Sequence, residues 1–289
     1  MISSYTKKHV GQKKTYTILL LVFFAMFCVV VLVPFATILL TSFKQTNRLL
    51  TDGFNLKVEK NIMSWDSYVY LFTGKHSFFL WYRNSVYLTV VQTLLTLFIS
   101  AWVAFGFSFY RFKGKDILYA CVLIVMMIPF EIMMLPLFME AINLKMTNSY
   151  FGIMIPYLAN ATVIFFFCQY LQGIPVELVE AGRIDGCNEY SIFLCLVFPL
   201  MKPALAAMSI LVGVNTWNNY LWPLLVLGDS HKFTLPIGLS SLIAMQGSNL
   251  NSYKILMAGS VMTVLPILLL FCFAQKYFIE GLSTGSVKG

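Results

Sequence analysis

The fold class of this chain is decided by the stretch YTILLLVFFAMFCVVVLVPFATILLTSF, residues 16–43. The stretch has 28 residues and no charged side chain. Because roughly 20 helical residues cross a hydrocarbon core about 30 Å thick, it is long enough to span a membrane. A cleavable signal peptide has a shorter apolar core that ends at a small-residue cleavage site. We therefore interpret residues 16–43 as a first transmembrane helix that is retained.

The rest of the chain has the composition of a membrane protein. Of its 289 residues, 59% are hydrophobic and 11% are charged, whereas a soluble domain carries about 45–50% apolar and about 25% charged residues. Five further apolar runs lie at 84–110, 117–139, 150–171, 203–227 and 255–273. Helix is the expected conformation, since an open backbone in lipid leaves polar groups unpaired and these runs are too long for barrel strands. The sequence predicts an all-α membrane protein with six transmembrane helices.

The segments between the runs set the expected topology. With the N-terminus inside, the predicted cytoplasmic segments hold 11 of the 20 Lys and Arg residues, which favours an N-in, C-in orientation. The predicted parts are a cytoplasmic segment 1–15, the first helix 16–43, an extracellular or periplasmic loop 44–83, a membrane core 84–276 and a cytoplasmic tail 277–289. Within the core, 172–202 is expected as a cytoplasmic loop. Residues 228–253 are expected as an irregular external loop, whose length favours contact with a partner protein.

Several function classes are excluded. The net charge of +8 does not indicate nucleic acid, because the basic residues flank apolar runs. The six cysteines lack the spacing of metal ligands and are expected to pack as small hydrophobes. The phosphate-binding pattern G-x-x-x-x-G-K-[ST] does not occur, and neither does H-E-x-x-H. We expect no catalytic residue, metal or cofactor in this chain, so any energy from ATP must arrive through a partner.

One polar stretch carries the strongest functional signal: GIPVELVEAGRIDGCNEYSIFLCLVFPLMKP, residues 173–203. It predicts two short helices, with Pro175 at the first helical position and Asn188 capping the second helix. The turn between them falls at Asp185-Gly186, where Gly186 can take a positive φ. The small pair Ala181-Gly182 suits close docking into a partner's cleft. The alternative is an amphipathic linker that lies on the membrane.

This stretch resembles the EAA loop of importer permeases of the ATP-binding-cassette (ABC) class. The family pattern is E-A-A, three residues, G, nine residues and I-x-L-P. The matching residues here are Glu180-Ala181-Gly182, Gly186 and Leu196-x-Phe198-Pro199. The spacing is kept throughout. Gly182, Leu196 and Phe198 depart from the pattern by changes among small or apolar residues.

The resemblance extends over roughly residues 80–289. IPFE at 128–131, LPL at 135–137 and IPY at 155–157 resemble the third and fourth spans of carbohydrate permeases. WNNYLWPL at 217–224 and TLPIGL at 234–239 resemble the fifth span and its external loop, and FIEGLSTGSVKG at 278–289 is similar to the tail of the smaller maltose-type permease. The combination of these motifs is far more specific than any one of them.

The resemblance implies a type I ABC importer permease fold with a cytoplasmic coupling helix. The implied partners are a second permease in a heterodimer, two ATPase subunits that use ATP and Mg, an external solute-binding protein, membrane lipid and a carbohydrate substrate. The implied location is the cell membrane. The residues expected to couple to the ATPase are Glu180, Ala181, Gly182, Asp185, Gly186 and Pro199.

The candidates for the substrate pathway are polar or aromatic residues inside apolar runs. They are Glu131, Asn160, Trp217, Asn218, Asn219 and Tyr220. A carboxylate deep in an apolar run is costly and usually faces a cavity or a partner. Glu131 could therefore accept a hydrogen bond from a sugar hydroxyl, contact a gate or pack between helices. Amides and aromatic rings suit a sugar, but they equally suit an interfacial belt or interhelical hydrogen bonds. Pro129 and Pro136 predict a kinked third span.

Two rival functions remain at this point. An ion-coupled carrier would work alone, but such carriers show internal repeats and intramembrane ion sites, and here Glu131 alone qualifies. The nearer rival keeps the importer class and changes the cargo to a solute such as glycerol phosphate. The runs contain no basic cluster that would hold a phosphate, so the sequence favours a carbohydrate.

Overall fold

A computed structural model describes residues 2–44, 63–73, 77–246 and 250–284 of the chain, and nearly all of them are helical. The chain divides into two compact units. The first takes in residues from 1–74 and 242–262, and the second takes in residues from 75–241 and 263–289. Among the described residues the only β-type pairing is an isolated bridge between Lys44 and Met63. The predicted all-α class is therefore confirmed.

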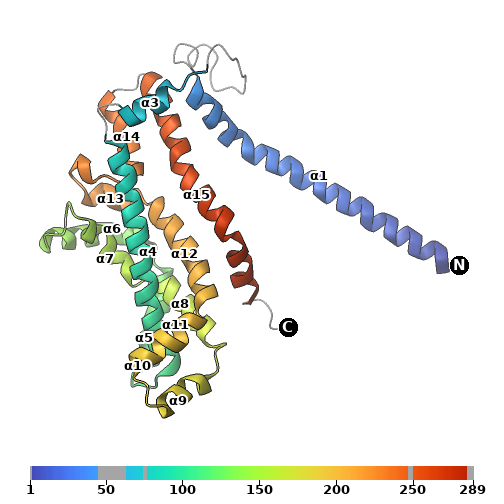
Figure 1. Ribbon diagram of the computed structural model, residues 1–289, viewed down its shortest axis with the longest axis vertical. Helices are drawn as coiled ribbons and strands as arrows, with labels where there is room; N and C mark the ends of the chain where they lie inside the picture. The colour runs from blue at the N-terminus through green and yellow to red at the C-terminus, as the bar shows by residue number, and fades with distance from the viewer. Residues whose placement is uncertain (1, 45–62, 74–76, 247–249, 285–289) are drawn as a thin grey trace. The chain divides into compact units, whose positions relative to one another are not determined.

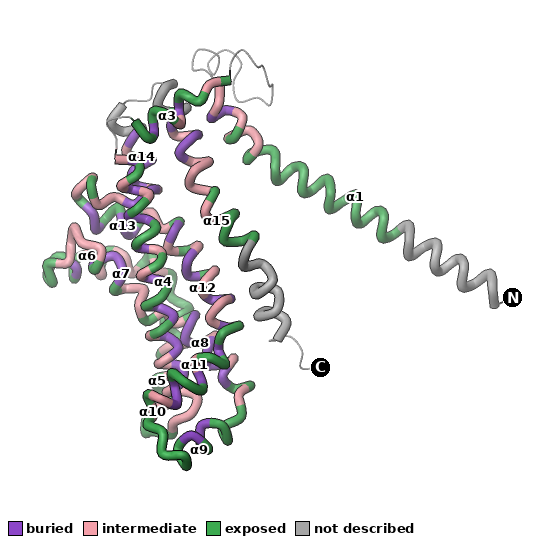
Figure 2. The backbone as a smooth tube through the Cα atoms, viewed as in Figure 1, coloured by how far each residue is buried: buried purple, intermediate pink, exposed green. Residues whose placement is uncertain are grey.

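The first unit is built on α1 (Ile2–Phe43), one continuous helix that includes most of the segment 1–15. Side chains at 16–35 are exposed along its length (Figure 2). At its end the Phe43 ring packs edge-on against Trp65, with centroids 4.9 Å apart, beside α3 (Asp66–Thr73). The hydroxyl groups of Ser42 and Tyr68 lie 2.7 Å apart and form a hydrogen bond. Residues 45–62 of the predicted loop 44–83 lie outside the described residues.

The second unit is organised around the 32-residue helix α4 (Phe78–Phe109; Figure 1). Three helices pack against α4, namely α7 (Tyr150–Leu158), α8 (Ala161–Leu171) and α12 (Lys202–Trp217). The remaining elements of this unit, in chain order, are α5 (Lys115–Met127), α6 (Phe130–Asn143), α7 (Tyr150–Leu158), α8 (Ala161–Leu171), α9 (Val176–Ile184), α10 (Glu189–Ser191), the π-helix η2 (Ile192–Val197), α11 (Phe198–Leu200), α12 (Lys202–Trp217), α13 (Leu221–Val226) and the 3-10 turn η3 (Ser230–Lys232). Two further helices, α14 (Leu235–Gln246) and α15 (Leu250–Thr284), contribute residues to both units.

Two buried apolar clusters lie along α4. One gathers Ala101, Ala104 and Phe105 of α4 with side chains from α8 to α12, including Phe167 and Phe193. The small residues on α4 let neighbouring helices approach closely, as is common where helices pack in lipid. The other cluster includes Leu88, Ile153, Met154, Trp222, Val226 and Ile237. The first cluster includes residues of the predicted loop 172–202, whereas the second includes residues of α13 and of the start of α14.

Three helical stretches are individually long and apolar enough to cross a membrane: Tyr16–Phe43, Phe78–Phe109 and Ile255–Cys272. Three pairs of shorter helices qualify together, although each pair is bent. They are α5 with α6, bent by 104°, α7 with α8, bent by 41°, and Glu189–Leu200 with α12, bent by 77°. Among the described residues, six spans follow if each bent pair counts as one.

The predicted third and fifth spans are not continuous helices. Pro129 has no N–H and disfavours helix at the residue before it, and Ile128 accordingly takes an extended conformation between α5 and α6. The predicted span 203–227 is broken at 218–220, after Asn218 ends α12. The break falls within WNNY at 217–220, where asparagine amides can compete for backbone hydrogen bonds.

The segment 228–253, predicted as an irregular external loop, is not irregular, so that part of the prediction is wrong. It contains η3 and the helix α14, and residues 247–249 lie outside the described residues. Tertiary contacts explain the difference. Gly238 lies so close to Trp81 of α4 that an added Cβ would come within 2.1 Å of the indole. Glycine at this position lets the α14 backbone pack directly on the ring.

Candidate functional site: the coupling hairpin and the polar pocket

The predicted pair of short helices is present, and we call residues 175–191 the coupling hairpin. Pro175 is the N-cap of α9, one residue before the predicted position. At the other end Gly186 has φ +80°, and the N–H of Cys187 donates to the Gly182 carbonyl at 3.0 Å. Together with the Gly186 N–H bond to Arg183, this is a Schellman motif, which requires a left-handed residue after the helix. Asn188 caps the second helix by accepting from the Ser191 N–H at 2.8 Å, as predicted.

The two faces of α9 have different roles. Val179 and Gly182 are buried inside the chain. A Cβ on Gly182 would lie 3.0 Å from Cδ1 of Leu196 and 3.2 Å from Cγ1 of Ile192, so this glycine lets α9 pack closely on η2. Glu180 and Ala181 are exposed on the opposite face. Of the small pair Ala181-Gly182, only Ala181 is exposed, because Gly182 is covered by its own chain.

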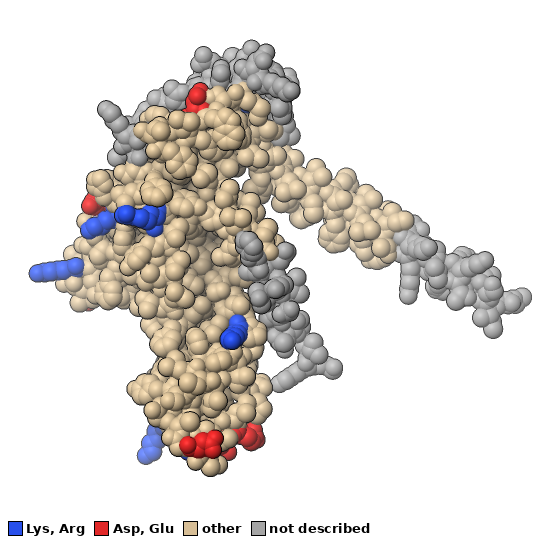
Figure 3. All heavy atoms as spheres, in the orientation of Figure 1, with Lys and Arg blue, Asp and Glu red and all other residues tan. Residues whose placement is uncertain are grey.

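The exposed surface of the hairpin carries acidic and apolar side chains together with Arg183. Ile184 is 86% exposed, and Glu180 and Asp185 are exposed as well. Figure 3 shows red acidic atoms at the tip where Figure 1 places α9. An exposed isoleucine bordered by carboxylates is a suitable surface for contact with another protein.

The hairpin is tied to the end of α4 by three side chains that sequence reasoning missed. Arg183 pairs with Glu189, with Nε 2.8 Å from Oε1 and Nη2 3.3 Å from Oε2. The hydroxyl of Tyr110, which follows α4, donates to the same carboxylate, and the Arg183 guanidinium lies 5.4 Å from the centre of the Tyr110 ring. The hydrogen bond with Glu189 raises the pKa of Arg183. Only the opposite charges six residues apart could have suggested this cluster from sequence.

Pro199 lies in α11 and is exposed. Proline lacks the N–H that would donate to the carbonyl four residues earlier. The turns just before Pro199 form the π-helix η2, a widened form found as short interruptions of α-helices. The chain then bends by 77° into α12. Pro199 therefore shapes the connection between the hairpin and α12 rather than the exposed surface of α9.

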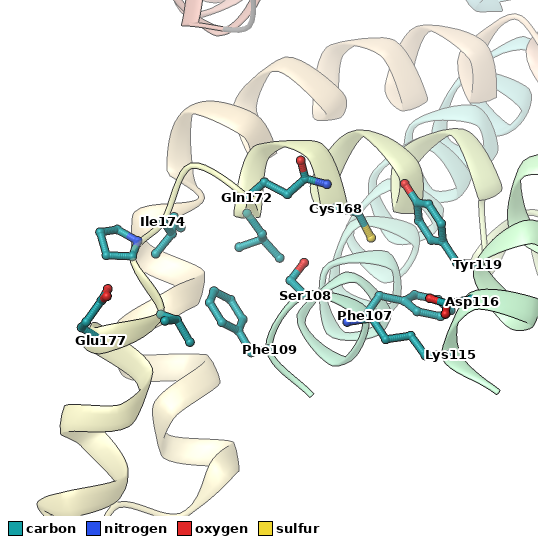
Figure 4. Close-up of a pocket in the computed structure, with 13 residues that line it drawn as sticks. Phe107, Ser108, Phe109, Lys115, Asp116, Tyr119, Cys168, Gln172, Ile174 and Glu177 are labelled. Carbon is teal, nitrogen blue, oxygen red and sulfur yellow. The ribbon is translucent and has the colours of Figure 1, made fainter. Parts of the chain in front are cut away.

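A cavity of about 520 Å³ lies beside the start of the hairpin (Figure 4). Its walls come from the end of α4, the start of α5, the end of α8 and the start of α9. Its lining includes Phe107, Phe109, Lys115, Tyr119, Gln172 and Glu177. The cavity leaves one side of the α9 N-terminus without packing against its own chain.

The structure brings two of the predicted pathway residues together. The amide of Asn219 donates to the Tyr157 hydroxyl at 3.0 Å, and Asn160 caps α8 by accepting from the Val163 N–H at 3.1 Å. Both line a small cavity of about 50 Å³, which we call the polar pocket. Its full lining is Gln92, Tyr157, Asn160, Leu211, Val212, Asn215, Thr216 and Asn219. Sequence reasoning missed Gln92 and Asn215, although each is a polar residue within an apolar run, and such residues are functional candidates.

The other pathway candidates do not line the polar pocket. Trp217 is buried, and its indole donates to the Thr263 carbonyl at 3.1 Å. Its ring also packs edge-on against Tyr82, so its role in this structure is packing. Asn218 is exposed at the end of α12, and Glu131 is exposed in the first turn of α6. Tyr220 packs against the cluster around Trp222.

At the other end of α4, buried side chains hold the segment 228–235, and we call this arrangement the α4 clamp. The Trp81 indole donates to the Ser230 carbonyl at 2.8 Å. The Asn84 amide donates to the carbonyls of His231 and Phe233, at 2.8 and 3.0 Å. The Ser85 hydroxyl accepts from the Leu235 N–H at 2.7 Å. This segment is therefore anchored by backbone-directed bonds from α4.

Comparison with known proteins places the chain in a family. Residues 96–284 match the family described as "Binding-protein-dependent transport system inner membrane component". The chain is 45% identical over 282 residues to the arabinooligosaccharides transport system permease protein AraQ of Bacillus subtilis (strain 168), covering 98% of this chain and 99% of that protein. It is 37% identical over 205 residues to the lactose transport system permease protein LacG of Rhizobium radiobacter, covering 71% of this chain and 74% of that protein.

A solved structure agrees with the sequence relatives. It is the crystal structure of a bacterial ABC transporter involved in the import of the acidic polysaccharide alginate, with a TM-score of 0.81 and 26% identity. The match covers 92% of this chain and 97% of that chain. The resemblance found from the EAA loop is confirmed. The chain belongs to the binding-protein-dependent transport system inner membrane components, the membrane permeases of ABC importers.

Proposed function

We propose that this chain is one of two membrane subunits of an importer for neutral oligosaccharides, driven by two ATPase subunits and supplied by a solute-binding protein. In this proposal the chain crosses the membrane six times with both termini inside. The coupling hairpin lies in the cytoplasm and contacts an ATPase subunit. The opposite end, with η3 and α14, contacts the solute-binding protein.

The observation that carries the proposal is the exposed face of α9. Ile184, 86% exposed, and the exposed Glu180 beside it are held outward by a helix whose other face packs on η2 (Figure 2). A hairpin of this kind can transmit force if a partner binds it differently in two states, because a ligand shifts an equilibrium only by its differential affinity. The sequence contains no phosphate-binding pattern of its own, which makes an ATPase the natural partner.

The relatives and the polar pocket together support a neutral sugar. The relatives above are named for arabinooligosaccharides and for lactose. The lining of the polar pocket consists of amides, hydroxyls and apolar side chains, with no charged residue. A phosphorylated solute is recognised by charge-assisted bonds from Arg or Lys, so the pocket favours a sugar over glycerol phosphate.

Reconstitution tests the proposal. The chain is assembled in vesicles with its partner permease, its ATPase and its solute-binding protein, and neutral oligosaccharides and glycerol 3-phosphate are screened. We expect a neutral oligosaccharide to stimulate ATP hydrolysis and to accumulate inside only when ATP is present. Uptake without nucleotide would contradict the importer mechanism, and stimulation by glycerol 3-phosphate alone would contradict the proposed substrate class.

A further inference from the structure

We infer that this chain itself supplies a binding subsite for sugar hydroxyl groups, formed by Gln92, Asn215 and Asn219 in the polar pocket. The inference rests on the proposed function and adds to it the residues and the part of the sugar that they bind. Three features of the pocket carry the argument: an unpartnered buried group, two helix breaks, and the match of size and charge to hydroxyl groups.

The first feature is the side chain of Gln92. It is only 2% exposed, and its Nε2 donates to the Thr216 hydroxyl at 3.2 Å. Its Oε1 is buried and has no hydrogen-bond partner among the described residues. Buried polar atoms are nearly always paired, since an unpaired one costs free energy. A hydroxyl group bound in the pocket would donate the missing hydrogen bond.

The second feature is that two helix interruptions meet at the pocket. The chain bends by 41° between α7 and α8, where Asn160 caps α8. It breaks again after α12, where Asn219 contacts Tyr157. The carbonyl of Tyr157, in the last turn of α7, accepts from the Thr96 hydroxyl at 3.1 Å. Interrupted helices at membrane depth are tolerated where they line a cavity, and in transporters they form substrate sites.

The third feature is the size and chemistry of the pocket. Its volume of about 50 Å³ holds only a few water-sized groups, because each needs about 10–15 Å³ on this measure. It therefore admits the hydroxyl-bearing edge of one sugar unit, while the rest of an oligosaccharide lies outside. Leu211 and Val212 supply apolar contacts for C–H groups, and the amide of the exposed Asn215 lies beside them.

Equilibrium dialysis of the assembled permease–ATPase complex in lipid nanodiscs, without the solute-binding protein, tests the subsite. The probe is a radiolabelled neutral arabino-oligosaccharide, and the variants are Asn215→Leu and Gln92→Met. We expect each variant to weaken binding by roughly 3- to 10-fold, the range for loss of one neutral hydrogen bond. Uptake by the complete importer should fall in both variants. Gln169→Met is the matched control, because it removes an exposed amide of α8 outside the pocket.

The possible results separate this inference from the proposed function. Wild-type affinity in both Asn215→Leu and Gln92→Met, as expected for a pocket that holds only water, overturns the subsite even if the importer transports the sugar. A wild-type complex that transports the sugar without binding it in dialysis also overturns the subsite. If the complete wild-type importer fails to take up any neutral oligosaccharide, the proposed function fails instead. Asn215 is exposed, so Asn215→Leu keeps the test decisive if Gln92→Met does not fold.

Discussion

The two ends of α4 hold their neighbouring segments in opposite ways. At one end the α4 clamp fixes residues 228–235 with buried side chains that bond to backbone groups. At the other end the coupling hairpin is tied by Tyr110, Arg183 and Glu189, whose ion pair is 36% and 40% exposed. Buried bonds to backbone are costly to break, whereas exposed ion pairs contribute little. The clamp therefore holds its segment firmly, whereas the hairpin projects and is only weakly attached to α4.

The largest effect on transport is expected from changes in the coupling hairpin. We predict that Glu180→Lys and Gly186→Val both abolish uptake while the protein remains in the membrane. Glu180 is exposed, so reversing its charge changes the surface and leaves the packing intact. Valine at φ +80° is strained by about 1–2 kcal/mol or more, which distorts the turn. Uptake into vesicles and the amount of protein in the membrane are measured together.

Glu140→Lys serves as a control for the charge reversal, because Glu140 is exposed at the far end of α6. It should retain uptake. Normal uptake by both hairpin variants would show that this face does not couple transport to the ATPase.

The contact between Trp81 of the clamp and Gly238 of α14 is expected to show the largest loss of stability. In Gly238→Ala the new Cβ would fall about 2.1–2.2 Å from the Trp81 ring. Over-packing of this kind costs about 3 kcal/mol at the upper end of its range, and we expect a clearly lower melting temperature in detergent. Gly106→Ala is the matched control, since an added Cβ there meets nothing within 4 Å. Equal melting temperatures for the two variants would mean that α14 does not depend on this contact.

A smaller loss is expected when the clamp loses hydrogen bonds without over-packing. Asn84→Leu leaves the carbonyls of His231 and Phe233 without their bonds from this amide. We predict destabilisation of about 2 kcal/mol, since each buried unpaired polar group costs roughly 1–3 kcal/mol. The melting temperature is compared with that of Asn218→Leu, which removes an exposed amide. If Asn84→Leu lowers the melting temperature no more than Asn218→Leu does, the Asn84 hydrogen bonds do not stabilise the segment 228–235.

The smallest effect is predicted for the exposed ion pair of the hairpin. Glu189→Gln and Arg183→Met should each lower stability by about 0–1 kcal/mol, the range for exposed pairs. A double-mutant cycle on melting temperature, repeated in high salt, measures the coupling between the two side chains. Screening by salt should reduce the coupling between Arg183 and Glu189 further. A coupling free energy close to the destabilisation of about 2 kcal/mol expected for Asn84→Leu would contradict the difference between the two ends of α4.

Much of the hairpin could be predicted from sequence, because its signals are local. A glycine after an aspartate marks the turn, and Asn188 lies where a cap is needed, so both features depend on residues within a few positions of each other. The direction in which each face of α9 points could not be predicted. Gly182 and Ala181 are both small, and only the position of η2 buries one and exposes the other.

The composition of the polar pocket, in contrast, could not be predicted from local sequence. By its chemistry Trp217 belongs with Asn160 and Asn219, because aromatic rings and amides both suit a sugar. The break after α12 points the two side chains into different surroundings: Trp217 toward Thr263 and Asn219 toward Tyr157. Gln92 joins the pocket from α4, more than a hundred residues before Asn219 in the chain. No local pattern reports such a contact.

The amino-acid sequence is sufficient to predict that the chain is helical, that it lies in a membrane and that it belongs to the importer permeases. These conclusions depend on apolar length, on charge placement and on a motif with fixed spacing, all of which are read along the chain. Only the packed structure shows which face of α9 remains exposed, how residues 228–246 fold and which amides share a pocket. Each of these depends on contacts between distant segments, whose energies outweigh local preference only when the helices pack together.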